Sequence, residues 1–221
     1  MGDIAEQEAS PAVHWGMVID LSKCVGCDSC TVACKAENRT PPGITYNVVL
    51  EYESGAYPNV RIENLPRPCM QCENPPCVAV CPVSATYRGD DGIVVIDADR
   101  CIGCKYCISA CPYGARAADE GATYESEMQA YDELQPPEYG VERGPRKRYA
   151  GTYGTVRKCT FCAHRIAYGE APACCETCIG DARIFGNLAD PSSRVAQLAA
   201  SPRAFRLKEE LGTNPSVYYL R

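Results

Sequence analysis

The spacing of the cysteines constrains this chain more than any other feature of its sequence. Sixteen of its 17 cysteines fall into four groups of four: Cys24, Cys27, Cys30, Cys34; Cys69, Cys72, Cys77, Cys81; Cys101, Cys104, Cys107, Cys111; and Cys159, Cys162, Cys174, Cys178. Three closely spaced cysteines wrap one iron–sulfur cube, while the fourth lies further along and faces a neighbouring cube. The pattern therefore predicts sixteen thiolate ligands for four [4Fe–4S] clusters.

Other uses of these cysteines fit the spacing less well. Disulfides need an oxidising compartment, and the two cysteines of a CxxC motif make a poor structural bridge to each other. Structural zinc sites use separated CxxC or CxxH pairs, so a CxxCxxC triplet has one thiolate too many. A three-iron cluster would be expected if one of the sixteen positions held a residue other than Cys. All sixteen positions hold Cys.

Cys175 lies outside the pattern, because Cys174 already keeps the CxxxC spacing to Cys178. We interpret Cys175 as a small buried apolar residue. The alternative is a register in which Cys175, rather than Cys174, is the ligand.

Composition supports a fold held by clusters and excludes several functions. The apolar share is 46%, but this counts the cysteines, and the chain has only 3 Phe and 1 Trp. A net charge of −6 with no basic stripe argues against nucleic-acid binding. No apolar run approaches the roughly 20 residues of a membrane-spanning helix, so no span is expected. The N-terminal MGDIAEQEAS has neither a basic nor an apolar segment, which predicts no export signal.

The chain contains an internal repeat. The segment from Val18 to Cys27 recurs from Val95 to Cys104, at a constant offset of 77 residues. Short strands are expected before groups one and three (16–21 and 93–97), and a turn at 88–92 joins the second of these to residues 85–87. Helices are expected at 29–38, 104–110, 159–168 and 192–200, and strands at 44–52, 59–63 and 182–185. The CxxxC pairs are expected at helix starts. The predicted fold class is α+β, with two duplicated bacterial-ferredoxin-like modules.

The hairpin between groups two and three indicates that these groups share two clusters, which leaves groups one and four to share the other two. The expected ligand sets are Cys24, Cys27, Cys30 and Cys178 for cluster one; Cys159, Cys162, Cys174 and Cys34 for cluster two; Cys69, Cys72, Cys77 and Cys111 for cluster three; and Cys101, Cys104, Cys107 and Cys81 for cluster four. The outer module then comprises residues 14–67 and 150–190, and the inner module residues 68–118. A C-terminal helix and strand follow at 191–221.

An acidic insert at 119–149 separates the third cysteine group from the fourth. Residues 119–142 contain eight acidic residues and no basic one, with Tyr124, Tyr131 and Tyr139 among them. A solvated loop and a partner-docking arm both explain this composition, and we favour docking slightly.

No catalytic constellation accompanies the cysteines, so no chemistry on a substrate is expected. The chain has only two histidines, and neither lies in a triad-like motif. His164 follows Cys162 by two residues and is either a surface or packing residue, which we favour, or the donor of a hydrogen bond to a sulfur. The same two interpretations apply to Lys158 and Arg165.

With these motifs laid out, the chain resembles the four-cluster iron–sulfur subunits of the dimethyl sulfoxide reductase family of molybdopterin oxidoreductases. The stretches MVIDLSKCVGCDSCTVACKAEN, CMQCENPPCVAVCPVSATY, DRCIGCKYCISACPYGAR and KCTFCAHRIAYGEAPAC carry the resemblance, over residues 14–221. Two positions depart from the family pattern, since Ile179 stands where many relatives have Pro, and the slot of Cys175 usually holds another residue. The resemblance implies the same ligand sets.

The resemblance also implies a function. It predicts a non-catalytic subunit that relays electrons between a molybdopterin (molybdenum or tungsten) catalytic subunit and an integral-membrane, quinone-reactive anchor. The alternative is a soluble polyferredoxin that serves a hydrogenase or formate enzyme. Family members travel folded with a partner that carries a twin-arginine signal, so the expected location is the outer, periplasmic face of the cytoplasmic membrane, with the inner face left open.

Overall fold

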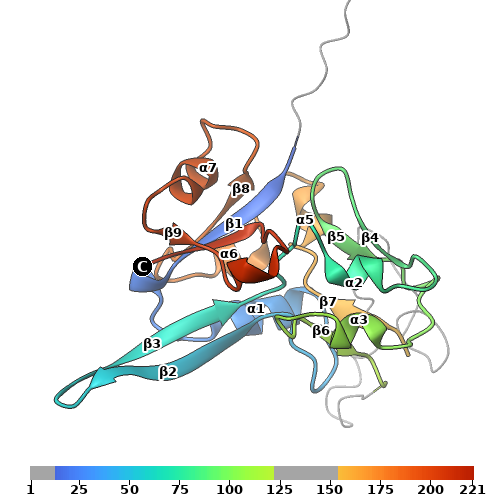
Figure 1. Cartoon of the computed structure of the whole chain (residues 1–221), viewed down its shortest axis with the longest axis horizontal. Helices are drawn as coiled ribbons and strands as arrows, with labels where there is room; N and C mark the ends of the chain where they lie inside the picture. Colours follow the sequence, from blue (N-terminus) through green and yellow to red (C-terminus); the bar gives the residue numbers. More distant parts are fainter. Residues whose placement is uncertain (1–12, 122–153) are drawn as a thin grey trace, which may run out of the picture.

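The largest element of the fold is a four-stranded sheet that brings together the two ends of the described chain. The computed structural model describes residues 13–121 and 154–221. The strand order is β8 (Arg183–Asn187), β1 (Trp15–Asp20), β10 (Val217–Leu220) and β9 (Ala204–Phe205). β1 runs parallel to β10 and antiparallel to β8, so that Val18 lies opposite both Tyr218 and Ile184. The C-terminal strand is thereby built into the sheet beside the first strand (Figure 1).

β1 is buried on both of its faces. Met17, Val18 and Ile19 have no exposed surface. Because side chains alternate along a strand, Met17 and Ile19 point into the core that contains the cysteines, while Val18 points to the opposite face and packs with Val195. The expected strand at 16–21 is confirmed, shifted by one residue.

Helix α7 (Arg194–Ala199) covers the Val18 face of the sheet. Its first turn is capped by Ser193, whose hydroxyl oxygen accepts a hydrogen bond from the Ala196 amide at 3.1 Å. A serine in this position satisfies a backbone donor that the helix leaves unpaired. The helix expected at 192–200 is therefore confirmed in a slightly shorter form.

Three antiparallel two-stranded sheets complete the β-structure of the described residues. β2 (Val48–Ala56) and β3 (Asn59–Arg67) form a long arm that projects from one side of the molecule (Figure 1). β4 (Thr86–Arg88) pairs with β5 (Val94–Ile96), and β6 (Arg116–Ala118) pairs with β7 (Val156–Lys158). The turn expected at 88–92 is confirmed. The strand expected at 44–52 lies four residues later, and the strand expected at 59–63 begins as predicted but extends to Arg67, because β2 and β3 pair along their whole lengths.

The helices near the cysteines are short. They are α1 (Ser29–Glu37), α2 (Pro76–Ala79), α3 (Tyr106–Ser109), α5 (Ala163–Ile166) and α6 (Ala173–Glu176), with 3-10 turns η1 (Leu21–Lys23) and η4 (Glu209–Leu211). The helices expected at 104–110 and 159–168 begin later than predicted, at Tyr106 and Ala163. The preceding Lys105 and Cys162 have φ values of 61° and 55°, and a helix cannot include a left-handed residue. The strand expected at 182–185 is β8.

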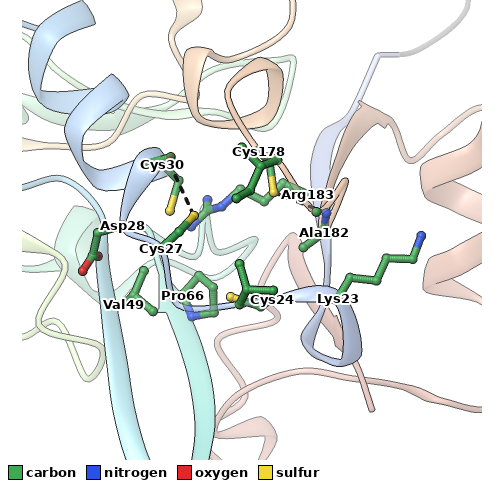
Figure 2. A pocket seen from close by; sticks show the side chains of 14 residues that line it. Lys23, Cys24, Cys27, Asp28, Cys30, Val49, Pro66, Cys178, Ala182 and Arg183 are labelled. Carbon is green, nitrogen blue, oxygen red and sulfur yellow. Dashed lines mark hydrogen bonds between the residues drawn. The ribbon is translucent and has the colours of Figure 1, made fainter.

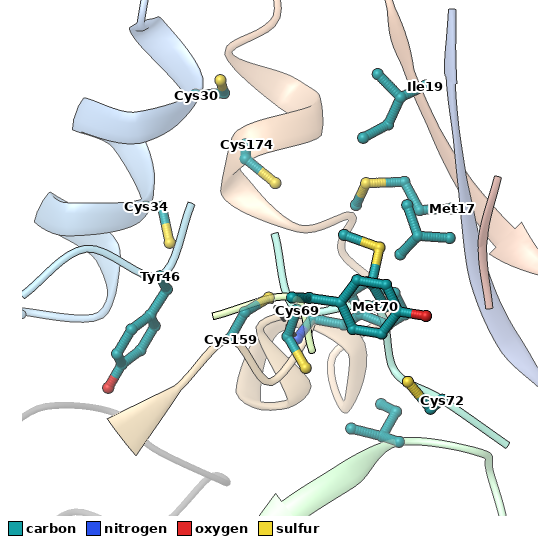
Figure 3. Packing of buried hydrophobic residues seen from close by; sticks show 14 of the residues in the cluster. Met17, Ile19, Cys30, Cys34, Tyr46, Cys69, Met70, Cys72, Cys159 and Cys174 are labelled. Carbon is teal, nitrogen blue, oxygen red and sulfur yellow. Dashed lines mark hydrogen bonds between the residues drawn. The ribbon is translucent and has the colours of Figure 1, made fainter. Parts of the chain in front are cut away.

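The core of the molecule is lined by cysteines. Its largest buried cluster contains Cys30, Cys34, Cys69, Cys72, Cys159 and Cys174 together with Met17, Ile19 and Tyr46 (Figure 3). Aliphatic side chains make up only part of this cluster, as the composition predicted. The mixture of short helices and strands confirms the α+β expectation.

The acidic insert lies outside the described residues from position 122 onward, so its predicted roles are not addressed by the fold. Among the helices of the described residues, none has both the length and the apolar content needed to cross a membrane.

Candidate iron–sulfur cluster sites

The same backbone bend occurs between the first two cysteines of all four groups. The residue immediately before the second cysteine has a left-handed conformation, with φ of 68° at Gly26, 47° at Gln71, 67° at Gly103 and 55° at Phe161. Only glycine adopts this conformation without steric cost. Gln71 and Phe161 adopt this conformation although it is sterically unfavourable for them, which indicates that every group requires the same bend. The bend turns the chain around a common centre.

The third cysteine of each group lies at the second position of a helix. Cys30 is the second residue of α1, Cys77 of α2, Cys107 of α3 and Cys174 of α6. The fourth cysteine follows four residues later, within α1 in group one and two residues beyond the helix in the other three groups, so it is displaced along the chain from the first three. This placement agrees with the expectation that CxxxC pairs begin at helix starts.

Site one is formed by the first three cysteines of group one and the last of group four. Cys24, Cys27, Cys30 and Cys178 line one pocket, together with Arg183 (Figure 2). Cys27 is exposed, whereas Cys30 is buried. Cysteines from the first and the last group of the chain thus line one pocket.

Site two is formed by Cys159, Cys162 and Cys174 with Cys34 of α1. All four are buried, and Cys34 lies close enough to the other three for each of them to raise its pKa, although burial is the larger cause. Helices α1 and α6 pack against each other and carry Cys34 and Cys174. The neighbouring Cys175 is partly exposed and packs against the core.

Site three is formed by Cys69, Cys72 and Cys77 with Cys111 of group three. These four line a second pocket together with Met70, Tyr113 and Arg116. Burial, followed by the neighbouring Cys69, raises the pKa of Cys72 to about 12. The fourth cysteine again comes from a different group.

Site four brings together Cys101, Cys104 and Cys107. Burial is the largest cause that raises the pKa of Cys107, and the nearby Cys101 and Cys104 raise it further. Cys81 lies two residues beyond α2, and α2 packs against α3. Its sulfur accepts the Thr86 amide at 3.5 Å. The packing of α2, which precedes Cys81, against α3, which carries Cys107, is the contact that connects Cys81 with the other three cysteines.

Hydrogen-bond donors point at the sulfurs in all four sites. Backbone amides reach Cys81, Cys159 and Cys178, the last at 3.3 Å from the Ala182 amide. Side-chain donors are Asn47, at 3.3 Å from the Cys30 sulfur, and Asn38, at 3.5 Å from the Cys34 sulfur. Donors of this kind stabilise anionic sulfur.

Arginines add charged donors at two of these places. The Arg116 guanidinium lies 3.0 Å from the Cys77 sulfur, and that of Arg183 lies 3.6 Å from the Cys174 sulfur. Each arginine follows the fourth cysteine of its group by five residues and opens a strand. Sequence reasoning missed both, although the repeated Ala-Arg at this spacing was a signal that could have found them. Asn38 and Asn47 carried no such signal.

Without a metal, burial disfavours the thiolate form that ligation requires. Burial raises the pKa of Cys159 to about 12 and that of Cys162 to about 11. Grouped thiols of this kind become thiolates when a positively charged metal centre replaces their protons. Four soft sulfur donors around a space lined with N–H groups suit an iron–sulfur cube, and the residues present therefore fit this cofactor.

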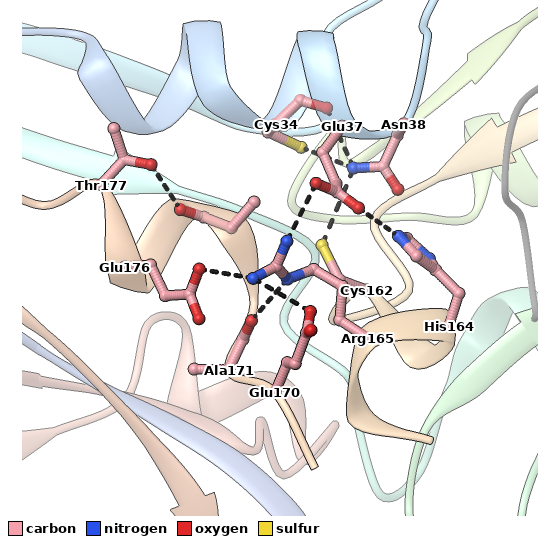
Figure 4. A network of polar contacts seen from close by, with 11 residues as sticks. Cys34, Glu37, Asn38, Cys162, His164, Arg165, Glu170, Ala171, Glu176 and Thr177 are labelled. Atoms are coloured by element: carbon pink, nitrogen blue, oxygen red, sulfur yellow. Dashed lines mark hydrogen bonds and ion pairs between the residues drawn. The ribbon is translucent and has the colours of Figure 1, made fainter. Parts of the chain in front are cut away.

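His164 serves a different purpose from the sulfur donor that we considered. Its Nε2 lies 2.7 Å from the Glu37 carboxylate, and Arg165 lies 3.1 Å from the same carboxylate (Figure 4). Arg165 also pairs with Glu170 and Glu176. This network joins α1, α5 and α6 around site two, so His164 and Arg165 hold the helices that carry the cysteines. Within the described part of the chain neither donates to a sulfur, and the packing interpretation is confirmed for both.

The fold and the sites define an iron–sulfur protein, and comparison with known families agrees. Residues 60–130 and 145–188 match the 4Fe-4S dicluster domain, and residues 15–36 match a 4Fe-4S binding domain. The zinc and disulfide alternatives are thereby disfavoured.

Known proteins resemble this chain along nearly its whole length. It is 56% identical to a subunit of the selenate reductase of Mesobacillus selenatarsenatis, over 94% of this chain and 72% of that protein. It is 43% identical to a subunit of the tetrathionate reductase of Salmonella typhimurium, over 96% and 74%. With the arsenate respiratory reductase iron-sulfur subunit of Shewanella sp. it shares 39% identity, over 93% and 95%. The chain belongs to the family of iron–sulfur electron-transfer subunits of dimethyl sulfoxide reductase-type enzymes.

Proposed function

We propose that this chain carries four [4Fe–4S] clusters and relays electrons within a respiratory oxidoreductase. The observation that supports the proposal is the position of the fourth cysteines: Cys178 lines a pocket with group one, Cys34 lies near the first three cysteines of group four, and Cys111 lines a pocket with group two. When bound, such clusters supply one-electron transfer. The sixteen cysteines are proposed as the ligands, with Cys81 completing site four, and the two pairs of groups as the outer and inner ferredoxin-like modules.

The sites follow one another in space in the order one, two, three, four. Helix α1 carries Cys30 of site one and Cys34 of site two, one helical turn apart. Cys69 of site three is close enough to Cys159 of site two to raise its pKa, after the larger effect of burial. Helices α2 and α3 then link sites three and four. This sequence of neighbours supports a linear path for electrons through the chain.

The residues of the chain bind, orient and shield the clusters along this path. The amide and side-chain donors at the sulfurs hold each site in a defined orientation, and the buried walls of sites two and three exclude water. The proposal assigns substrate chemistry to a separate molybdopterin subunit. A second, membrane-embedded subunit is proposed to exchange electrons with quinone, on the outer face of the cytoplasmic membrane. The family relationship favours this arrangement over a free polyferredoxin.

Metal analysis of the native complex, purified without oxygen, tests this function. About sixteen irons contributed by this chain, with molybdenum or tungsten in the same complex, are expected. Iron in this amount without either metal would point instead to a polyferredoxin, and zinc in place of iron would contradict the electron-transfer function.

A further inference from the structure

Each gap between consecutive sites contains a buried cationic side chain. Arg183, Lys158 and Arg116 are 5%, 2% and 6% exposed. They occupy the gaps between sites one and two, two and three, and three and four, respectively. Burial of a charge is costly unless an opposite charge compensates it, so each of the three needs an anionic partner nearby.

Arg183 connects site one with site two. One guanidinium nitrogen lies 3.6 Å from the Cys174 sulfur of site two. The other donates to the Asn47 side-chain oxygen at 2.5 Å, and the Asn47 amide in turn donates to the Cys30 sulfur of site one at 3.3 Å. Arg183 also lines the pocket at site one (Figure 2).

Lys158 lies between the cysteine loops of sites two and three. Its ammonium group donates to the carbonyl oxygen of Cys159 at 2.5 Å and to that of Val94. It also reaches the Gln71 side-chain oxygen at 3.4 Å, within the loop between Cys69 and Cys72. Gln71 closes the arrangement by donating to the Cys159 carbonyl at 2.8 Å.

Arg116 connects site three with site four. One nitrogen lies 3.0 Å from the Cys77 sulfur of site three. The other lies 3.2 Å from the Thr86 hydroxyl, and the Thr86 amide donates to the Cys81 sulfur. The guanidinium is also close enough to Cys107 of site four to lower the pKa of that thiol, against the larger effect of burial.

Carboxylates, the usual partners of buried cations, do not pair with these three residues in the described part of the chain. Across residues 13–121 and 154–221, none of the three forms an ion pair with an Asp or Glu side chain. The adjacent Arg157 differs, because it pairs with Asp119. The groups that Arg183, Lys158 and Arg116 do face belong to the cysteine sites, which become anionic when their thiols lose protons to bind a cluster.

We propose that Arg183, Lys158 and Arg116 are positioning residues that each raise the reduction potentials of the two clusters on either side. One-electron reduction adds one negative charge to a site whose thiolates already make it anionic. A cation held a few ångströms away in a dry interior stabilises the reduced form more than the oxidised form. The three cations thus favour electron occupancy at every step of the path. This inference rests on the proposed four-cluster function.

The test is a redox titration, followed by electron paramagnetic resonance, of the anaerobically purified complex with Arg116→Gln or Arg116→Lys. Arg116→Gln is expected to make reduction of two of the four clusters at least about tenfold less favourable, a shift of about 59 mV to lower potential for one electron. Arg116→Lys keeps the charge and is expected to retain most of the potential. The reduction potentials of the other two clusters should not change.

Lys105→Gln is the matched control, because Lys105 follows the ligand Cys104 directly but is 54% exposed at its side chain. Solvent screens its charge, so a smaller shift is expected. If Arg116→Gln loses iron, Lys158→Gln provides the same measurement for sites two and three. A neutral variant that keeps its iron and its potentials, or that shifts them no more than Lys105→Gln, would overturn the inference. Absence of iron–sulfur signals in the unaltered complex would instead contradict the proposed function.

Discussion

Arg157 and Asp119 form a fully buried ion pair, with 3.5 Å between the guanidinium and the carboxylate and no exposed side-chain surface on either residue. The pair joins Asp119, the first residue of the acidic insert, to Arg157 in strand β7. The backbone is tied in the same place, since Asp119 and Thr155 share a hydrogen bond of 2.8 Å. The described residues on either side of 122–153 are therefore held together by an ion pair and a backbone hydrogen bond.

Removing the carboxylate of this pair is expected to destabilise the protein strongly. Asp119→Ala removes the carboxylate while the Arg157 guanidinium stays buried, which costs about 3–5 kcal/mol in comparable cases. The measurement is the urea concentration at which the iron–sulfur absorbance is half lost, under argon. Glu120→Ala is the control, because Glu120 is 73% exposed and its pair with Lys105 lies at the surface. Its expected effect is small because solvent screens the pair, and equal effects of the two variants would refute the prediction.

The exchange of fourth ligands predicts which cluster each cysteine variant alters. Cys34 belongs to group one in sequence but lies with Cys159, Cys162 and Cys174 in space. Cys34→Ser should therefore change the electron paramagnetic resonance signal of cluster two and leave that of cluster one unchanged. Cys175→Ser is the control and should leave all signals unchanged. A signal lost in Cys175→Ser and kept in Cys174→Ser would establish the other register of group four.

The surface around site four is expected to receive a redox partner. Ile102 and Tyr106 flank the exposed Cys104 and are themselves 65% and 66% exposed. Exposed apolar side chains of this kind favour a protein contact. Ile102→Asp should reduce electron transfer through the complex at least several-fold while its iron content stays the same. Tyr168→Asp, at an 86% exposed position just beyond another helix, should have no effect, and an equal loss there would argue against a specific contact.

His14 makes stability depend on pH. Burial, followed by the nearby Arg88, lowers its pKa below the ordinary value of 6.5, despite opposing effects of Glu73 and Asp91. The unfolded chain then binds a proton at a higher pH than the folded one, so stability falls as the pH drops through about 6.5 and levels off below the folded pKa. The test is the urea midpoint between pH 7.5 and 5.5. In His14→Gln the urea midpoint should fall less steeply as the pH drops. An unchanged dependence of the midpoint on pH would exclude His14 as its source.

Much of the fold was predictable because cysteine spacing and strand alternation are local properties. The strand before Cys24, the turn at 88–92 and the helix that begins at Ser29 follow from neighbouring residues alone. The helices near Cys107 and Cys162 were predicted to begin too early. There the left-handed residues of the loops override helical preference, because the chain must first turn around a common centre.

The sequence by itself determined the number and grouping of the cysteines, and with them the class of cofactor, since ligand spacing is set by the local backbone. Only the tertiary structure decided which cations lie between the sites. Arg116 reaches Cys77 across 39 positions, and Arg183 reaches Asn47 across 136. Contacts at such separations depend on how helices and hairpins pack against one another. The repeated Ala-Arg marks both arginines in the sequence, but it does not say which sulfur or amide each of them reaches.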